Sequence, residues 1–347
     1  MSETIVRALD VGYGNTKYVQ FHAKGSEIAC SLFPSITPQA SVGTDLTGGV
    51  FQKRNTVIVE VNGVRYEVGR DARLAQDASY GRTLDADYSL TDSYMALVRG
   101  AIAYMGVPHI DLLVLGLPVN THAQYSSTLQ QRVLGVHKIP SPDGQMIDVE
   151  VRSVQVTPQP IGAFFDYTIR HGVFGRMKNQ TNLLIDPGYY TLDWVVSHGV
   201  KMINARSGAH AGGMSSILST IGESVSKELG HQLQDFAAID EAIRTGGRPR
   251  FFGKERDISE HIRLGKEKAR QFVSVLATKV GNAGVDIDNI ILAGGGAEFF
   301  RDVIQEKFPN HELHMTYEPV FANVRGFQLA GEQFMSARTF NQARSAA

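Results

Sequence analysis

Two short stretches, one in each half of the chain, set its organisation. Residues 5–17 read IVRALDVGYGNTK, and residues 183–193 read LLIDPGYYTLD. A shift of 176 residues superimposes them, so that Asp10 falls on Asp186. Each stretch is an apolar strand that ends at an aspartate, followed by a glycine turn and a second strand. One Asp-x-Gly step marks any tight turn, but two copies in matching strand contexts predict a repeated functional element.

The chemistry of such a hairpin suits phosphate. A glycine turn exposes several backbone N–H groups on one side, where no side chain obstructs an approaching oxygen. An aspartate at the preceding strand end can face the same phosphate through Mg²⁺, which favours one or two carboxylates with waters and phosphate oxygens. A P-loop or dinucleotide fingerprint would continue into a helix, whereas residues 16–19 read as a strand. The repeat therefore predicts two hairpins that hold a triphosphate from both sides.

A third glycine-rich step follows a strand in the last quarter of the chain. The apolar run 289–293 leads into residues 294–297, GGGA, and a helix is expected to begin near Glu298. Small residues at this step would let a purine or its ribose lie against the backbone. Alone the step is a weak signal, because a helix packed tightly on a strand has the same composition. As the third member of an ordered series it predicts an adenosine contact.

Composition bounds the class of protein. The chain has 347 residues, 34 Lys and Arg against 35 Asp and Glu, and 43% hydrophobic residues, as in a globular protein too long for one core. The balanced charge argues against a broad nucleic-acid-binding face. The single cysteine, Cys30, excludes an internal disulfide, the apolar runs are too short for a membrane helix, and the N-terminus has no signal-peptide pattern. We therefore expect a cytoplasmic, two-lobed α/β protein without direct nucleic-acid or membrane contact.

Local patterns predict the other secondary-structure elements. Apolar periodicity predicts a buried strand over 112–117 and helices over 92–105, 214–229, 258–280 and 325–344. The strongest hairpin signal is Asn-Gly at 62–63, between strands expected at 56–61 and 64–68. A second hairpin is expected within 136–156, with its turn at 142–144.

The order of these features resembles one superfamily. In chain order, the two hairpins, the glycine triplet and the step at 323–326 resemble the phosphate-1, phosphate-2, adenosine and connect-2 segments of actin, DnaK-type chaperones and sugar kinases. The connect-1 segment would lie around Gln159 to Ala163. Within it, the chain is similar to the ParM/StbA group of bacterial actin-like plasmid-segregation proteins. The supporting steps are Phe33-Pro34-Ser35, Tyr66-x-Val68-Gly69 and Gly116-Leu117-Pro118.

This resemblance covers nearly the whole chain. It implies a two-lobed actin-like α/β fold in which each lobe is an RNase H-like mixed sheet with helices and a smaller inserted subdomain. Lobe I would span 1–165 with an insertion at about 31–90, and lobe II would span 166–347 with an insertion at about 206–285. The C-terminal helix could pack back on lobe I.

The resemblance also implies roles for individual residues. Asp10 and Asp186 would position Mg²⁺ through water, although each could instead cap its own turn. Gln159 stands where ParM-type proteins can carry Glu and actins carry Gln; it would orient the attacking water rather than deprotonate it, or simply lie in a proline-bounded turn. The expected catalytic residues are Asp10, Gln159 and Asp186. The expected nucleotide-binding residues are Asp10, Gly12, Tyr13, Gly14, Asn15, Thr16, Lys17, Gly188, Tyr189, Tyr190, Thr191, Gly294, Gly295, Gly296 and Ala297.

The implied function is a Mg-dependent ATPase, with GTP as an alternative nucleotide, that forms filaments and moves or positions plasmid-type DNA through an adaptor protein. Another actin-like cytoskeletal ATPase would carry the same motifs. The rival from a different class is a monomeric sugar-kinase-like phosphotransferase, but we find no aspartate poised toward a hydroxyl substrate. The basic residues within 244–256 form either a solvated loop or a contact with a filament neighbour or DNA.

Overall fold

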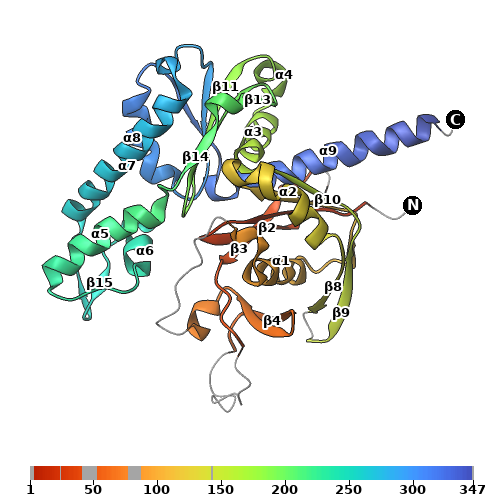
Figure 1. Cartoon of the computed structure of the whole chain (residues 1–347), viewed down its shortest axis with the longest axis horizontal. Coiled ribbons are helices and arrows are strands. Elements are labelled where there is room, and N and C mark those ends of the chain that lie inside the picture. The colour runs from red at the N-terminus through yellow and green to blue at the C-terminus, as the bar shows by residue number, and fades with distance from the viewer. Residues whose placement is uncertain (1–3, 24, 41–52, 77–86, 142–143, 346–347) are drawn as a thin grey trace. The chain divides into compact units, whose positions relative to one another are not determined.

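The computed structural model describes residues 4–23, 25–40, 53–76, 87–141 and 144–345. The chain folds into two compact units (Figure 1). Unit 1 comprises Met1–Asp166 with Phe321–Ala347, and unit 2 comprises Tyr167–Val320. Each unit contains a mixed β-sheet with helices, so the predicted α/β class is confirmed. None of the described helices has both the length and the apolar character needed to cross a membrane.

Unit 1 is built on a five-stranded sheet in the order β10-β7-β1-β2-β3. Its strands are β1 (Val6–Val11), β2 (Asn15–Phe21), β3 (Ala29–Pro34), β7 (Leu112–Leu117) and β10 (Val154–Pro158). β1 pairs antiparallel with β2 and parallel with β7, and β7 pairs parallel with β10. Both β1 and β7 are buried along their whole length. Burial on two faces explains why the sequence of β7 is a continuous apolar run rather than an alternating one.

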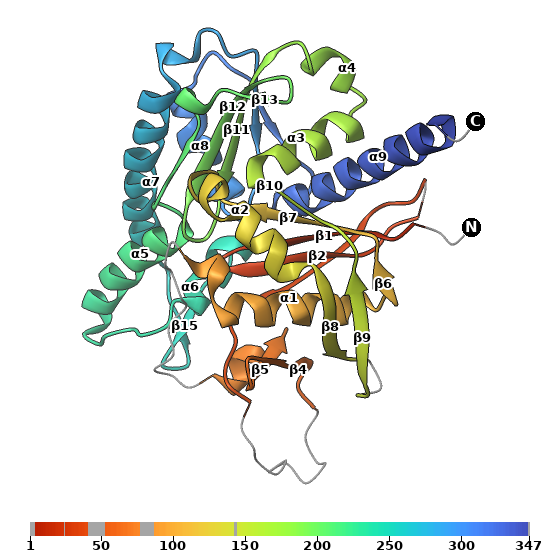
Figure 2. The same cartoon turned by 45° about the vertical axis from the view of Figure 1, so that its right-hand side comes forward.

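Helices cover both faces of this sheet (Figure 2). α1 (Asp92–Met105) lies on the face that carries Leu9 and Leu115, and α9 (Ala322–Ser345) lies on the face that carries Ala8 and Val114. α2 (Val119–Val133) follows β7, and α3 (Gln159–Arg170) follows β10. α3 begins at Gln159, and the proline at position 160 fits the first turn of a helix.

Smaller elements complete unit 1. β4 (Thr56–Val61) and β5 (Val64–Gly69) form the hairpin predicted from Asn-Gly, and both turn residues have positive φ, 50° at Asn62 and 79° at Gly63. In the predicted 136–156 hairpin only β8 (Gly135–Pro140) and β9 (Met146–Val151) pair with each other, since β10 joins β7 instead. The expected turn at 142–144 lies mostly outside the described residues. The remaining elements are β6 (His109–Ile110), η1 (Ala72–Ala75) and η2 (Tyr88–Leu90).

Unit 2 contains a six-stranded sheet in the order β13-β12-β11-β17-β18, with β14 paired to β12. Its strands are β11 (Thr181–Pro187), β12 (Leu192–His198), β13 (Lys201–Met202), β14 (Gly208–His210), β17 (Asn289–Leu292) and β18 (Leu313–Met315). Its helices are α4 (Phe174–Met177), α5 (Met214–Leu229), α6 (Ala237–Thr245), α7 (Ser259–Val280) and α8 (Ala297–Lys307). Short elements are β15 (Arg250–Phe251), β16 (Lys254–Glu255), η3 (Asn204–Arg206) and η4 (Asn282–Gly284), with η5 (Pro319–Phe321) at the boundary of the units. α5 and α7 pack against each other, and α8 packs on α7.

The two sheets repeat each other at their centres. In unit 1, Asp10 lies opposite Lys17 across β1 and β2; in unit 2, Asp186 lies opposite Asp193 across β11 and β12. All three residue pairs of the first hairpin recur in the second after the 176-residue shift. The predicted repeat is therefore a repeat of strand register.

The repeat extends to a third strand in each sheet. β7 runs parallel to β1 with Leu112 opposite Val6, and β17 runs parallel to β11 with Asn289 opposite Asn182. β10 then lies outside β7 as β18 lies outside β17. The segments that lead from β7 into α2 and from β17 into α8 therefore occupy corresponding places in the two units.

Candidate functional site

Asp10 is the centre of a buried polar group in unit 1. Its side chain is 1% exposed, its Oδ2 lies 2.8 Å from Nζ of Lys17, and its Oδ1 accepts a hydrogen bond of 2.6 Å from Nε2 of Gln159. Lys17 is the cross-strand neighbour of Asp10, which places the two side chains on the same face of the sheet. Gln159 is the first residue of α3 and is itself buried. Two of the three predicted catalytic residues thus meet in unit 1, with Lys17 as the charge partner.

The turn between β1 and β2 is fixed by its backbone. The N–H of Gly12 donates to the carbonyl of Asn15 at 3.2 Å, and the carbonyl of Gly14 accepts from the N–H of Ser35 at 3.0 Å. The Thr16 side chain is fully buried, with its hydroxyl 2.9 Å from that of Ser35. Since the Thr16 hydroxyl is engaged inside the unit, phosphate contacts from this turn would come from backbone N–H groups.

Aromatic rings support the same turn. The ring of Tyr13 stacks on Tyr88 with centroids 5.0 Å apart, and Tyr88 meets Tyr94 edge-on at 5.4 Å. Burial, and then the charge of Asp10, raise the pKa of Tyr94 well above its ordinary value, so its hydroxyl stays protonated. The three tyrosines join the turn to η2 and to the first turn of α1.

Asp186 holds the corresponding position in unit 2. The N–H of Gly188 donates to the carbonyl of Thr191 at 2.8 Å, which closes the same kind of turn. Opposite Asp186 stands Asp193, in the place that Lys17 occupies in unit 1, and both carboxylates are buried. Like charges directly opposite each other are unfavourable. The two hairpins therefore share their backbone but differ in charge.

The glycine triplet packs against the hairpin of unit 2. Gly294 has a φ of +88°, and a Cβ at that position would lie 2.0 Å from Oδ1 of Asp186. The N–H of Gly296 donates to the carbonyl of Pro187 at 2.9 Å. α8 begins at Ala297, directly after the triplet. Within unit 2 the structure thus brings together the two segments that the sequence predicted to contact phosphate and adenosine.

A further segment at this hairpin was missed by the sequence analysis. The carbonyls of the turn 188–190 accept hydrogen bonds of 2.7 to 3.0 Å from the N–H groups of residues 213–215, where α5 begins. A Cβ at Gly213 would lie 2.6 Å from the carbonyl oxygens of Gly188 and Tyr189. The Gly-Gly pair at 212–213, directly before an amphipathic helix, was the signal that could have identified it.

The carboxylates fit a Mg²⁺ that is held mainly by a nucleotide. Among the described residues, no three His, Cys, Asp or Glu side chains gather as a metal-binding group. Mg²⁺ often needs only one or two carboxylates when phosphates and waters supply the other ligands. Asp10 is already neutralised by Lys17, whereas Asp186 faces Asp193. The two hairpins therefore differ in the charges that they place beside a bound cation.

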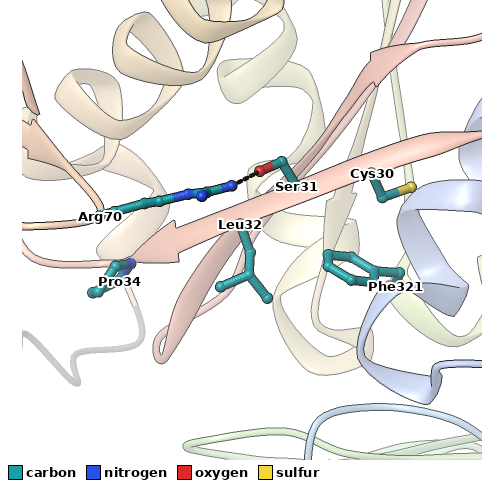
Figure 3. A pocket seen from close by; sticks show the side chains of 6 residues that line it. All are labelled: Cys30, Ser31, Leu32, Pro34, Arg70 and Phe321. Carbon is teal, nitrogen blue, oxygen red and sulfur yellow. Dashed lines mark hydrogen bonds between the residues drawn. The ribbon is translucent and has the colours of Figure 1, made fainter. Parts of the chain in front are cut away.

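A pocket of about 360 Å³ lies elsewhere in unit 1, beside β3 (Figure 3). Nη2 of Arg70 donates to the Ser31 hydroxyl at 3.0 Å along this strand. The pocket is lined by Cys30, Ser31, Leu32, Pro34, Arg70 and Phe321. None of the predicted site residues lines it, so it is separate from the candidate site.

Two family models match the chain, one in each unit. The N-terminal domain of actin-like proteins matches residues 8–162, and the C-terminal domain of the MreB-like archaeal actin homologue matches residues 184–306. The first match contains Asp10 and Gln159, and the second contains Asp186 and the glycine triplet. No curated protein matches the chain.

Solved structures share the fold over nearly the whole chain. The archaeal actin homologue Ta0583 is 19% identical, with a TM-score of 0.75 over 95% of this chain and 100% of its own; a complex of that protein with ADP is also similar. The apo ParM protein of psk41 is 20% identical, with a TM-score of 0.70 over 97% and 99%. ParM from a 15-stranded filament of Clostridium botulinum is 20% identical, with a TM-score of 0.75 over 96% and 100%. With both units matched, the predicted actin-like fold is confirmed, and the chain belongs to the actin-like proteins.

Proposed function

We propose that this protein is a Mg-dependent ATPase of the cytoplasm that assembles into filaments and positions plasmid-type DNA through an adaptor protein. The observation that carries the proposal is the repeated hairpin: each unit holds an aspartate at the same register position, directly before a glycine turn. One such hairpin could be purely structural. The same aspartate in both sheets supports binding of one triphosphate by both hairpins.

The proposed chemistry is attack of a water oxygen on the γ-phosphorus. The new P–O bond forms as the bond to the β,γ-bridging oxygen breaks, so that ADP leaves and the proton of the water passes to phosphate or solvent. Gln159 donates its Nε2 hydrogen to Asp10, which leaves its Oε1 free to accept a hydrogen bond from that water. A glutamine amide is too weak a base to take the proton, so hydrolysis by this group would be slow and dominated by water positioning.

The other residues would bind the nucleotide. Backbone N–H groups of the two glycine turns would hold the phosphates, and the triplet beside Asp186 would leave room for the ribose or base. When bound, Mg²⁺ would neutralise charge on the β- and γ-phosphates. Asp186 would orient it, and Asp10, fixed by Lys17 and Gln159, would hold nearby water.

Self-association is the partner that the fold relatives favour, because ParM of Clostridium botulinum has been solved as a filament. We propose head-to-tail contacts that do not close on themselves and therefore propagate. The γ-phosphate would favour the state that polymerises, and hydrolysis would remove that preference. The size of this switch is bounded by the difference in nucleotide affinity between the two states.

Sedimentation tests the proposal directly. The protein is spun at several concentrations with Mg²⁺ and a non-hydrolysable ATP analogue, with ADP, or without nucleotide. We expect pelleting mainly with the analogue, and filaments by electron microscopy. Equal pelleting in all three samples would break the link between nucleotide and assembly. No pelleting in any sample, together with intact ATP hydrolysis, would favour the monomeric phosphotransferase.

A further inference from the structure

The side chain of Phe327, on α9, fills a slot between two glycines of unit 1. A Cβ at Gly116, in β7, would lie 2.7 Å from Cε2 and 2.8 Å from Cζ of the Phe327 ring. A Cβ at Gly162, in α3, would lie 2.7 Å from Cε1 of the same ring. Phe327 is only 1% exposed. Any larger residue at either glycine would displace the ring, so the ring and the two glycines are fitted to each other.

The same slot holds the stem of Gln159. A Cβ at Gly116 would also lie 2.9 Å from Cγ of Gln159, so the Phe327 ring and the Gln159 stem both pack against the same glycine. A glutamine side chain has three rotatable bonds, and it keeps one rotamer only when its neighbours exclude the others. The Phe327 ring on one side and Asp10, at 2.6 Å, on the other supply that restriction.

The backbone around Phe327 is itself held firmly. A Cβ at Gly326 would lie 1.7 Å from the carbonyl oxygen of Gly162, so α9 and α3 cross in direct backbone contact. Arg325 makes two hydrogen bonds of 2.9 Å to the carboxylate of Asp166, and both side chains are 3% exposed. A planar two-point ion pair fixes orientation as well as distance. The neighbours of Phe327 therefore hold its ring in one place.

We propose that Phe327 is a positioning residue that holds the Gln159 amide against Asp10 and so aims it at the attacking water. The proposal rests on the proposed ATPase function. Phe327 touches neither nucleotide nor water in this scheme; it acts through Gln159. A residue about 170 positions further along the chain thus sets the geometry of the predicted water-orienting group.

The decisive experiment is a double-mutant cycle on ATP hydrolysis. Phe327→Leu should lower kcat about tenfold and leave KM within about twofold, because a loosened orienting group is felt mainly in the transition state. In a Gln159→Ala background, Phe327→Leu should change kcat by less than about twofold, since the group it positions is gone. Equal fold losses in both backgrounds, or an unchanged kcat for Phe327→Leu alone, would overturn the proposal. Phe308→Leu is the matched control, because Phe308 is 2% exposed at the end of α8 and lies outside the site; its kcat should be unchanged.

A second measurement does not depend on catalysis. In protein labelled with ¹⁵N-glutamine, the side-chain amide signal of Gln159 is assigned by its loss in Gln159→Ala. We expect Phe327→Leu to shift or broaden this signal without nucleotide, and a wild-type signal would overturn the proposal. If the wild-type protein hydrolyses no ATP, the proposed function fails while this arm still decides the role of Phe327. Phe327→Met, which introduces a side chain similar in size to leucine but unbranched and adaptable, replaces Phe327→Leu if the latter does not fold.

Discussion

The ion pair between Asp166 and Arg325 offers the clearest test of the packing in unit 1. Asp166→Asn keeps the shape of the side chain but removes its charge. One guanidinium N–H then loses its acceptor. The positive charge of Arg325, whose side chain is only 3% exposed, remains buried beside a neutral group. Removing one partner of a buried pair costs about 3–5 kcal/mol. In a unit of 150–250 residues, 1 kcal/mol moves Tm by about 2–4 °C, so we expect a loss of about 10 °C.

Glu150→Gln is the matched control for this substitution. Glu150 lies 3.1 Å from Arg152 in the same unit, but the two side chains are 54% and 50% exposed. Exposed pairs contribute little because water screens them, so the same transition should move by less than about 4 °C. Both variants lose one negative charge, which removes net charge as an explanation for any difference.

Calorimetry records the unfolding of the whole protein, and fluorescence of the single tryptophan, Trp194, identifies which part of that transition belongs to unit 2. Replacing the pair by Asp166→Leu with Arg325→Met should recover most of the loss, because two apolar groups leave no buried charge behind. Equal shifts for Asp166→Asn and Glu150→Gln would show that burial of the pair has been misread. A double variant no more stable than Asp166→Asn would show the same.

Two further predictions concern chemistry and pH. Asp186→Ala should lower the ATP hydrolysis rate on the order of 10²-fold, because a group that positions metal or water is lost. Circular dichroism should show an unchanged fold. Hydrolysis at the wild-type rate would mean that Asp186 is not part of the site. Burial lowers the pKa of His137 below its ordinary value, despite a hydrogen bond to the Val133 carbonyl. The neutral, buried His137 therefore stabilises the fold fully above about pH 6.5, and this stabilisation is lost as the pH falls below that value, because the unfolded chain then binds the proton more readily. His137→Gln should therefore flatten the fall in urea midpoint between about pH 7.5 and 5.5, and an unchanged slope would contradict this assignment.

Features with a local cause could be predicted from the sequence. Asn-Gly at 62–63 needs positive φ at both residues, and the turn has it. The repeat around Asp10 and Asp186 predicted the same strand, turn and strand in both halves, and the structure shows that the two turns of equal length give equal register. In contrast, α2 was not predicted, since most of its residues are polar and few of them are buried.

The candidate site was predictable in type but not in its contacts. The repeated hairpin indicated Asp10, and the resemblance to actin-like proteins indicated Gln159, each separately. Their hydrogen bond joins residues 149 positions apart, and the Asp166–Arg325 pair joins residues 159 apart. Such pairs depend on how the helices cross the sheet, which periodicity does not determine. Lys17 lay within the predicted site, but only the structure gave it a partner in Asp10.

Replacing a glycine in α9 can test whether local helix propensity or long-range packing decides stability there. By helix propensity alone, Gly326→Ala in α9 should gain up to about 1 kcal/mol. The structure predicts the opposite sign, because the new Cβ would lie 1.7 Å from the Gly162 carbonyl oxygen and would force α3 and α9 apart; overpacking of this kind costs about 1–3 kcal/mol or more. Gly175→Ala is the control, since Gly175 lies in α4 with no neighbouring atom within 4 Å of the new Cβ, and it should be neutral or slightly stabilising. Urea denaturation of both variants decides the matter: a Gly326→Ala protein as stable as wild type would mean that the two helices do not cross in backbone contact.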